Sequence, residues 1–406
     1  MSQTRAPRIE TLLNGLKVFI LQDPQAELVT AKLRVNAGAA FDQQGKEGTM
    51  KMLAESIFLT DEARRYFVDD LDGSFAVETN YDFIQLSVSG RRAAMIDLLE
   101  TLANAVTEPQ IDKDTTEAVR SRVKKELAAK MADPVYIADS ATAERLFGTF
   151  PYGRPILGTN ESLTKIDFAD LRFAKSRFFG ADNAVLTIRG NIDAAEAYRA
   201  VRRFFGAWLK SDRRVPATFR QPDSPDTSLL VKNISSDSGA EVRHAVRGTS
   251  RSAQDFAAMD ILAKVLDSRL KAHVAKVANA SGSVRNEAHL LPGQMVFVVS
   301  GIGTDAKVKL YPGGNSVDGT ALIATLLSSP ISADELLTAK NKVLAAFDSG
   351  SPDELWLDTE TYKLPAPSMQ RDRIASADLA AVQKLADSIK QRPAVSLWMV
   401  KGIGSN

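Results

Sequence analysis

The sequence contains no cysteine. Without thiols, the chain cannot form disulfides, thiolate metal sites or a cysteine nucleophile. The absence leaves the compartment open, because a chain without cysteine tolerates reducing and oxidising surroundings alike. Residues 1–7 lack the apolar core of a signal peptide. We therefore expect either a cytoplasmic protein or a bacterial periplasmic protein whose signal peptide has been removed.

Histidine is also scarce, and the three histidines, His244, His273 and His289, all lie in the second half of the chain. A zinc site built from histidine usually has at least two ligands close together in sequence. The first half of the chain cannot supply even one. No Gly-x-Ser-x-Gly elbow and no P-loop run occurs, so the sequence supports neither a serine hydrolase nor a nucleotide-binding site.

Neither charge sign is in excess, and no long apolar run is present. The 51 Lys and Arg residues balance 50 Asp and Glu residues, which leaves a net charge of +1. This balance gives no sign of a nucleic-acid partner or an anionic membrane surface. No run approaches the roughly 18 apolar residues of a membrane-spanning helix. We predict a protein without nucleic-acid partners and without a membrane span.

Two pairs of segments repeat along the 406 residues at nearly the same interval. Leu86–Gly90 returns as Val298–Gly301, and the second glycine lies 211 positions after the first. Ile166–Leu171 returns as Ile374–Leu379, 208 positions later. Two repeats in the same order at this interval indicate a duplication within the chain.

A proline-rich, charged stretch separates the repeats and is typical of an exposed linker. We therefore predict an N-terminal half over residues 1–212, a linker over 213–227 and a C-terminal half over 228–406. Short strand-like runs come in pairs, and long amphipathic helices lie between them. This pattern predicts an α+β fold of two homologous halves, each a mixed or antiparallel sheet covered on one face by helices.

Six motifs lie in order along almost the whole chain, at Leu13–Val18, Asn36–Gly48, Pro151–Thr159, Asp182–Gly190, Phe205–Trp208 and Asp267–Leu270. Together they resemble motifs of the pitrilysin/insulinase zinc peptidases. They are similar in particular to those of the short, two-chain branch that includes mitochondrial processing peptidase and the respiratory bc1 core proteins. The resemblance implies that two such chains pair around a chamber, where unfolded peptide adds to a sheet edge as an extra strand.

The position of the family's inverted zinc motif, His-x-x-Glu-His, is occupied by different residues here. Lys51 stands for the first histidine, Ala54 for the catalytic glutamate and Glu55 for the second histidine. Glu126 fits the place of the third ligand, 71 positions after Glu55. An ammonium repels Zn²⁺ and a methyl group cannot activate water. We expect either a salt bridge of Lys51 with Glu55 or Glu126 in place of the metal, or a solvated helix face.

The family's second-half site residues, an arginine and a tyrosine, are absent as well. Counted from Asp267–Leu270, their positions fall at Ala278 and Gly282. Arg285 lies close to these positions and is a candidate substitute for the arginine. The resemblance therefore implies no catalytic residue, no metal and no cofactor in this chain.

The function that the resemblance implies is that of a non-catalytic subunit of a heterodimeric zinc peptidase. Such a subunit binds unfolded peptide and completes the chamber of a homologous partner chain, which carries the zinc. Two alternatives stay open. One is a weak metallopeptidase that uses Glu55, Glu126 and a further ligand, and the other is a structural core subunit of a respiratory complex.

Overall fold

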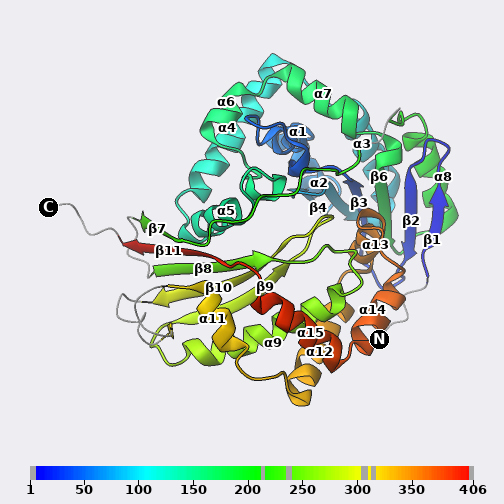
Figure 1. Cartoon of the computed structure of the whole chain (residues 1–406). Helices are drawn as coiled ribbons and strands as arrows, with labels where there is room; N and C mark the ends of the chain where they lie inside the picture. Colours follow the sequence, from blue (N-terminus) through cyan, green and yellow to red (C-terminus); the bar gives the residue numbers. More distant parts are fainter. Residues whose placement is uncertain (1–5, 212–214, 235–239, 303–309, 312–316, 402–406) are drawn as a thin grey trace. The chain divides into compact units, whose positions relative to one another are not determined.

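The computed structural model describes residues 6–211, 215–234, 240–302, 310–311 and 317–401 (Figure 1). Residues 213 and 214 of the predicted linker lie outside this part. The chain forms two compact units that do not follow the order of the sequence. Unit 1 comprises residues 1–127, 155–218 and 351–364, and unit 2 comprises residues 128–154, 219–350 and 365–406.

Unit 1 contains a mixed sheet of six strands in the order β1-β2-β6-β3-β5-β4. The strands are β1 (Arg8–Thr11), β2 (Lys17–Gln22), β3 (Leu28–Val35), β4 (Ser74–Thr79), β5 (Ile84–Arg91) and β6 (Ala184–Gly190). Strands β2 and β6 are parallel and the other neighbours are antiparallel.

Unit 2 contains a mixed sheet of five strands in the order β7-β11-β8-β10-β9. The strands are β7 (Leu229–Ile234), β8 (Ala240–Arg247), β9 (Ser281–Glu287), β10 (Gln294–Ile302) and β11 (Val395–Lys401). Strands β7 and β11 are parallel and the other neighbours are antiparallel. This order repeats β2-β6-β3-β5-β4 of unit 1, and its parallel pair stands in the same place. The α+β fold of two homologous halves is thereby confirmed.

Helices occupy much of the remaining chain. In chain order they are α1 (Thr49–Ser56), α2 (Asp61–Asp69), α3 (Met95–Thr107), α4 (Lys113–Lys130), α5 (Pro134–Phe147), α6 (Asn160–Lys165), α7 (Phe168–Phe178), α8 (Ala194–Phe205), α9 (Phe256–Val274), α11 (Gly319–Leu326), α12 (Ala333–Asp348), α13 (Pro352–Thr361), α14 (Pro367–Ser376) and α15 (Leu379–Lys390). Short 3-10 turns are present at Ala39–Phe41, Arg92–Ala94, Pro151–Gly153 and Ala181–Asn183.

One helix from each half of the chain belongs to the unit built mainly from the other half. Helix α5 packs on β8 and β11 in unit 2, through Ala138, Ala141, Leu397 and Met399. Helix α13 packs on β2 and β6 in unit 1, where Leu357 contacts the apolar side chains of those strands. The sequence predicted helices on one face of each sheet, and these two helices lie on the opposite face.

The two faces of the unit 1 sheet differ in chemistry. Along β3, Val29, Ala31, Leu33 and Val35 alternate with the polar run Thr30, Lys32 and Arg34, so each set lies on its own face. On the apolar face, Gly90 of β5 packs against Leu98 of α3. The polar face carries Lys32 and Arg34 and is the one on which α13 lies. Helix α13 therefore covers a sheet face that carries charged side chains on β3 and apolar side chains on β2 and β6.

Candidate functional site

Helix α1 carries the degenerate zinc motif, and Asp42 caps its first turn. The two carboxylate oxygens of Asp42 accept hydrogen bonds from the backbone N–H groups of Gly48 and Met50, each at 2.8 Å. Gly48 has a left-handed φ of 96°, and a β-carbon there would meet Leu163 at 2.9 Å. Every residue of α1 is buried, so packing on all sides holds this helix within unit 1.

Lys51 lies between the two carboxylates that replace zinc ligands. Its ammonium is 3.0 Å from Oε1 of Glu55 and 3.1 Å from Oε2 of Glu126. The Lys51 and Glu55 side chains are only 11% and 6% exposed, which excludes a solvated helix face. Of the two alternatives that the sequence left open, the structure shows the salt bridge, and it forms with both acids at once.

Two arginines outside the motif complete the cluster. Arg64 of α2 binds Oε2 of Glu55 at 2.7 Å, and Arg122 of α4 lies 3.8 Å from the same oxygen. Arg122 stands one helical turn before Glu126, so helical spacing could have placed both on one face. Nothing in the sequence around Arg64 reveals its role, because only the fold brings α2 beside α1.

The electrostatic environment keeps Glu55 ionised. Burial by itself raises the pKa of this carboxyl group, but the hydrogen bond from Arg64 and the attraction of Lys51 outweigh it. The net result is a pKa below the ordinary value of glutamate. Three cationic side chains thus surround an anionic Glu55 at the place where the motif would put a metal ion.

The second-half positions lie in unit 2 and do not form a catalytic pair. Ala278 lies exposed in the turn after α9. Gly282 lies on β9, and a β-carbon there would be 3.0 Å from Leu270 and 3.1 Å from Val274, so this position faces α9. Arg285, the candidate substitute, binds Asp139 of α5 at 2.9 Å and Glu287 at 3.1 Å.

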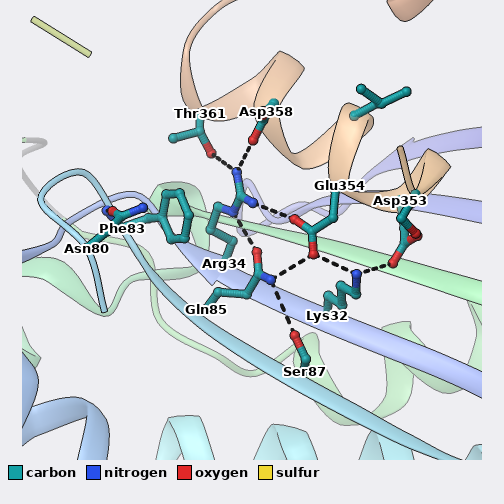
Figure 2. A network of polar contacts seen from close by, with 12 residues as sticks. Lys32, Arg34, Asn80, Phe83, Gln85, Ser87, Asp353, Glu354, Asp358 and Thr361 are labelled. Carbon is teal, nitrogen blue, oxygen red and sulfur yellow. Dashed lines mark hydrogen bonds and ion pairs between the residues drawn. The ribbon is translucent and has the colours of Figure 1, made fainter. Parts of the chain in front are cut away.

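A second polar network joins the unit 1 sheet to α13, as Figure 2 shows. Arg34 is 2% exposed and binds Glu354 and Asp358 of α13, both at 2.8 Å, while the ring of Phe83 lies 3.8 Å from its guanidinium carbon. Lys32 binds Asp353 at 2.7 Å and Glu354 at 2.6 Å. Lys32 and Arg34 alternate with apolar residues along β3, and this pattern in the sequence could have predicted a charged network on one face of the strand.

Comparison with known proteins identifies the class to which this fold and this helix belong. Residues 17–160 match the family model described as insulinase (peptidase family M16), and residues 165–343 match the model described as peptidase M16 inactive domain. The chain belongs to the M16 peptidase family.

Two relatives show the range of proteins that the chain resembles. An uncharacterized zinc protease of Mycobacterium bovis is 25% identical over 240 residues, which cover 56% of this chain and 54% of that protein. The non-peptidase homolog YmxG of Helicobacter pylori is 24% identical over 160 residues, 39% of this chain and 37% of that protein. The chain therefore matches only about half the length of its curated relatives.

Solved structures share the fold over nearly the whole chain. A protease from Helicobacter pylori has a TM-score of 0.85 and 16% identity, covering 98% of this chain and 100% of that chain. The periplasmic protease PqqL from Escherichia coli has a TM-score of 0.78 and 14% identity, covering 99% of this chain but 48% of that chain. The same fold therefore also occurs within a chain about twice as long.

The residues at the motif position do not fit the zinc ion that the family implies. A metal bridging Glu55 and Glu126 would take the place of the Lys51 ammonium, and Arg64 and Arg122 would repel it. Ala54, fully buried, offers no base at the place of the catalytic glutamate. Within the described ranges, no three His, Cys, Asp or Glu side chains are grouped to hold a metal ion. Within those ranges, too, no helix is both long and apolar enough to cross a membrane.

Proposed function

We propose that this chain is the non-catalytic subunit of a two-chain zinc peptidase, which binds unfolded peptide and completes the chamber of a zinc-bearing homologue. The observation that carries the proposal is the position of Lys51 between Glu55 and Glu126. A buried ammonium between two carboxylates neutralises them, as a bound dication would. On this proposal, the Lys51 salt bridges keep the M16 fold intact without a metal ion.

Strand β4 is the place where we expect peptide to bind. It ends the unit 1 sheet, and among the described strands it pairs only with β5. Helices α1 and α2 both contact β4, so this edge lies beside the Lys51 cluster. An extended peptide can add to such an edge through backbone hydrogen bonds, without requiring a particular sequence.

Aromatic packing holds this edge in place on its apolar face. The ring of Phe75 in β4 lies 5.1 Å from that of Phe58 and 5.5 Å from that of Phe67 in α2. The opposite face of β4 carries Ser74, Ala76 and Glu78, which are exposed. A bound strand would therefore meet a rigid backbone edge and a polar surface, as peptide binding of low sequence specificity requires.

Hydrogen-bond alternation shows which N–H groups of β4 face outward. The N–H of Asn80 bonds to the carbonyl of Phe83 at the end of the hairpin. In an antiparallel pair such bonding recurs at every second residue, so Ala76 and Glu78 bond to β5 and Val77 points its N–H to the free edge. Val77→Pro removes an outward donor and leaves the β4–β5 ladder intact.

The peptide-binding test uses fluorescently labelled β-casein as an unfolded polypeptide. We expect wild-type protein to bind it, and Val77→Pro to weaken binding about tenfold, which is the effect of one or two lost hydrogen bonds. Ile9→Pro is the matched control, because Ile9 has the same outward orientation on β1 at the other edge of the sheet. Equal binding by wild type and Val77→Pro would exclude β4 as the peptide site.

The subunit test uses co-expression with an M16 chain from the same genome that has an intact His-x-x-Glu-His motif. We expect a stable complex whose chelator-sensitive cleavage of β-casein exceeds that of either chain alone. Chelator-sensitive cleavage by the isolated chain would contradict the proposal and favour a peptidase in its own right.

A further inference from the structure

A basic stripe runs along the exposed side of α8 in unit 1. Arg199, Arg202 and Arg203 are exposed and recur at helical spacing, while Ala197, Ala200, Val201 and Phe205 form the buried side. Lys210, just beyond the helix, is exposed as well. No carboxylate lies within salt-bridge distance of these four cations among the described residues.

Two protruding leucines stand at the C-terminal end of this stripe. Leu13 is 107% exposed and Leu209 is 81% exposed, the highest values among the large apolar residues of the described chain. The amide of Asn14 donates hydrogen bonds to the carbonyls of Phe205 and Trp208, at 2.8 and 2.9 Å. Leu13 directly precedes Asn14 and Leu209 directly follows Trp208, so this contact places the two leucines on neighbouring turns.

The turns that present the leucines are rigidly held. Trp208 is buried and its indole N–H donates to the carbonyl of Phe179. The carbonyl of Leu209 accepts from the N–H of Ala181, and a β-carbon on Gly15 would lie 2.8 Å from Asp182. Leu13 and Leu209 are thus held outward by the fold, and their apolar surface is exposed among the residues of unit 1 that the structure describes.

Two acidic residues near this surface are already engaged, whereas Glu196, one turn before Arg199 on α8, is exposed. Glu10 pairs with Arg8, whose guanidinium lies 4.8 Å from the centre of the Tyr198 ring on α8. Asp182 accepts a hydrogen bond from the backbone of Ser211. The stripe therefore keeps a local positive charge that the near-neutral net charge of the chain conceals.

From this arrangement we propose that Leu13, Leu209 and the α8 stripe form a docking surface for an anionic lipid bilayer. Protruding leucines can enter the region between lipid headgroups without a complementary pocket, while arginines and lysines bind the anionic headgroups beside them. Two leucines and four cations give reversible association and not permanent anchoring. A protein partner would need a pocket for each leucine, and leucine is under-represented among residues that dominate protein interfaces.

The test is co-sedimentation of the full chain with vesicles of phosphatidylcholine alone and of phosphatidylcholine with phosphatidylglycerol. We expect binding to the anionic vesicles only, weakened by salt. Arg202→Glu with Arg203→Glu should reduce binding by about tenfold or more. Leu13→Ser with Leu209→Ser should reduce it at any salt concentration.

Matched controls come from unit 2. Leu337→Ser replaces an exposed leucine of α12, and Lys384→Glu with Lys390→Glu reverses two exposed cations of α15. These variants should bind as the wild type does. Absence of binding to anionic vesicles, equal binding to both vesicles, or unchanged binding by the Leu13 and Leu209 variant would each overturn the proposal. So would a dimer of the wild-type chain that this variant abolishes.

Discussion

Arg34 of β3 and Arg243 of β8 lie on corresponding strands of the two sheets, and each is buried against an acidic residue of the helix that packs on its own sheet. Arg34 binds Asp358 of α13 at 2.8 Å, and Arg243 binds Asp139 of α5 at 2.6 Å. Strands β3 and β8 hold the same place in the two strand orders, and α5 and α13 both begin with a proline. In each unit, therefore, a buried arginine on the corresponding strand attaches the helix to the sheet.

Loss of the buried Arg34 guanidinium should lower the free energy of unfolding. Arg34→Met leaves Glu354, Asp358 and Gln85 without their shared donor, and breaking a buried ion pair on one side costs about 3 kcal/mol. We expect a loss of that size in the free energy of unfolding, measured by urea denaturation. Arg371→Met is the control, because Arg371 forms a bidentate pair with Asp348 at the surface, and its loss should change stability little. Equal effects of the two changes would contradict this account.

Replacement of Glu55 should destabilise the protein more than replacement of Lys51. Glu55→Gln removes the single anion that Lys51, Arg64 and Arg122 all approach, so like charges are left together; we expect a loss of about 3 kcal/mol. Lys51→Met leaves Glu55 paired with Arg64 and should cost less. Thermal and urea unfolding of both variants measure the order. A Lys51→Met variant less stable than Glu55→Gln would show that the two arginines do not hold Glu55.

The N-terminal cap of α1 is a separate element of stability. Asp42→Ala removes the acceptor of two helix N–H groups, and loss of such a cap costs about 1–2 kcal/mol. Hydrogen exchange should show faster exchange in α1 and unchanged protection in α9 of unit 2. Unchanged exchange in α1 would mean that burial alone holds the helix.

Acid should weaken one identifiable contact of unit 2. The hydrogen bond from Arg269 lowers the pKa of Glu335 to about 2, aided by backbone and side-chain bonds of Ser332. Because this pKa lies below the unfolded value near 4.5, the stabilisation is complete above pH 4.5 and is lost as the pH falls toward 2. Wild type should therefore exceed Glu335→Gln in stability at neutral pH and converge with it over that window. A constant difference would contradict the assignment.

Sequence patterns predicted the fold class and the duplication, and they named Glu55 and Glu126 as alternative partners of Lys51. They succeeded because strand alternation, helix spacing and the family motifs are local properties. They could not reveal that α5 and α13 lie in the other unit, because that packing depends on contacts between residues far apart in the sequence. Arg243 and Asp139 lie 104 positions apart, and Arg34 and Asp358 lie 324 positions apart. The role of Arg64 was missed for another reason: it lies only nine positions after Glu55, but only the packing of α2 beside α1 brings the two side chains together.

Arg269 belongs to a sequence motif whose structural role depends on contacts that the sequence does not show. Its segment, Asp267–Leu270, supported the family resemblance, yet only the structure shows its contacts. The guanidinium of Arg269 binds both oxygens of Glu335 and the carbonyls of Leu326, Ser329 and Pro330. It thus joins α9 to the start of α12.

The metal content of the protein tests the central claim most directly. The full chain is purified from cells grown with ample zinc, dialysed without chelator and measured by elemental analysis, beside a homologue with an intact His-x-x-Glu-His motif. We predict stoichiometric zinc in the homologue and only trace zinc in this chain, because the Lys51 ammonium fills the place between Glu55 and Glu126. One zinc per chain, lost on Glu126→Gln, would contradict the account.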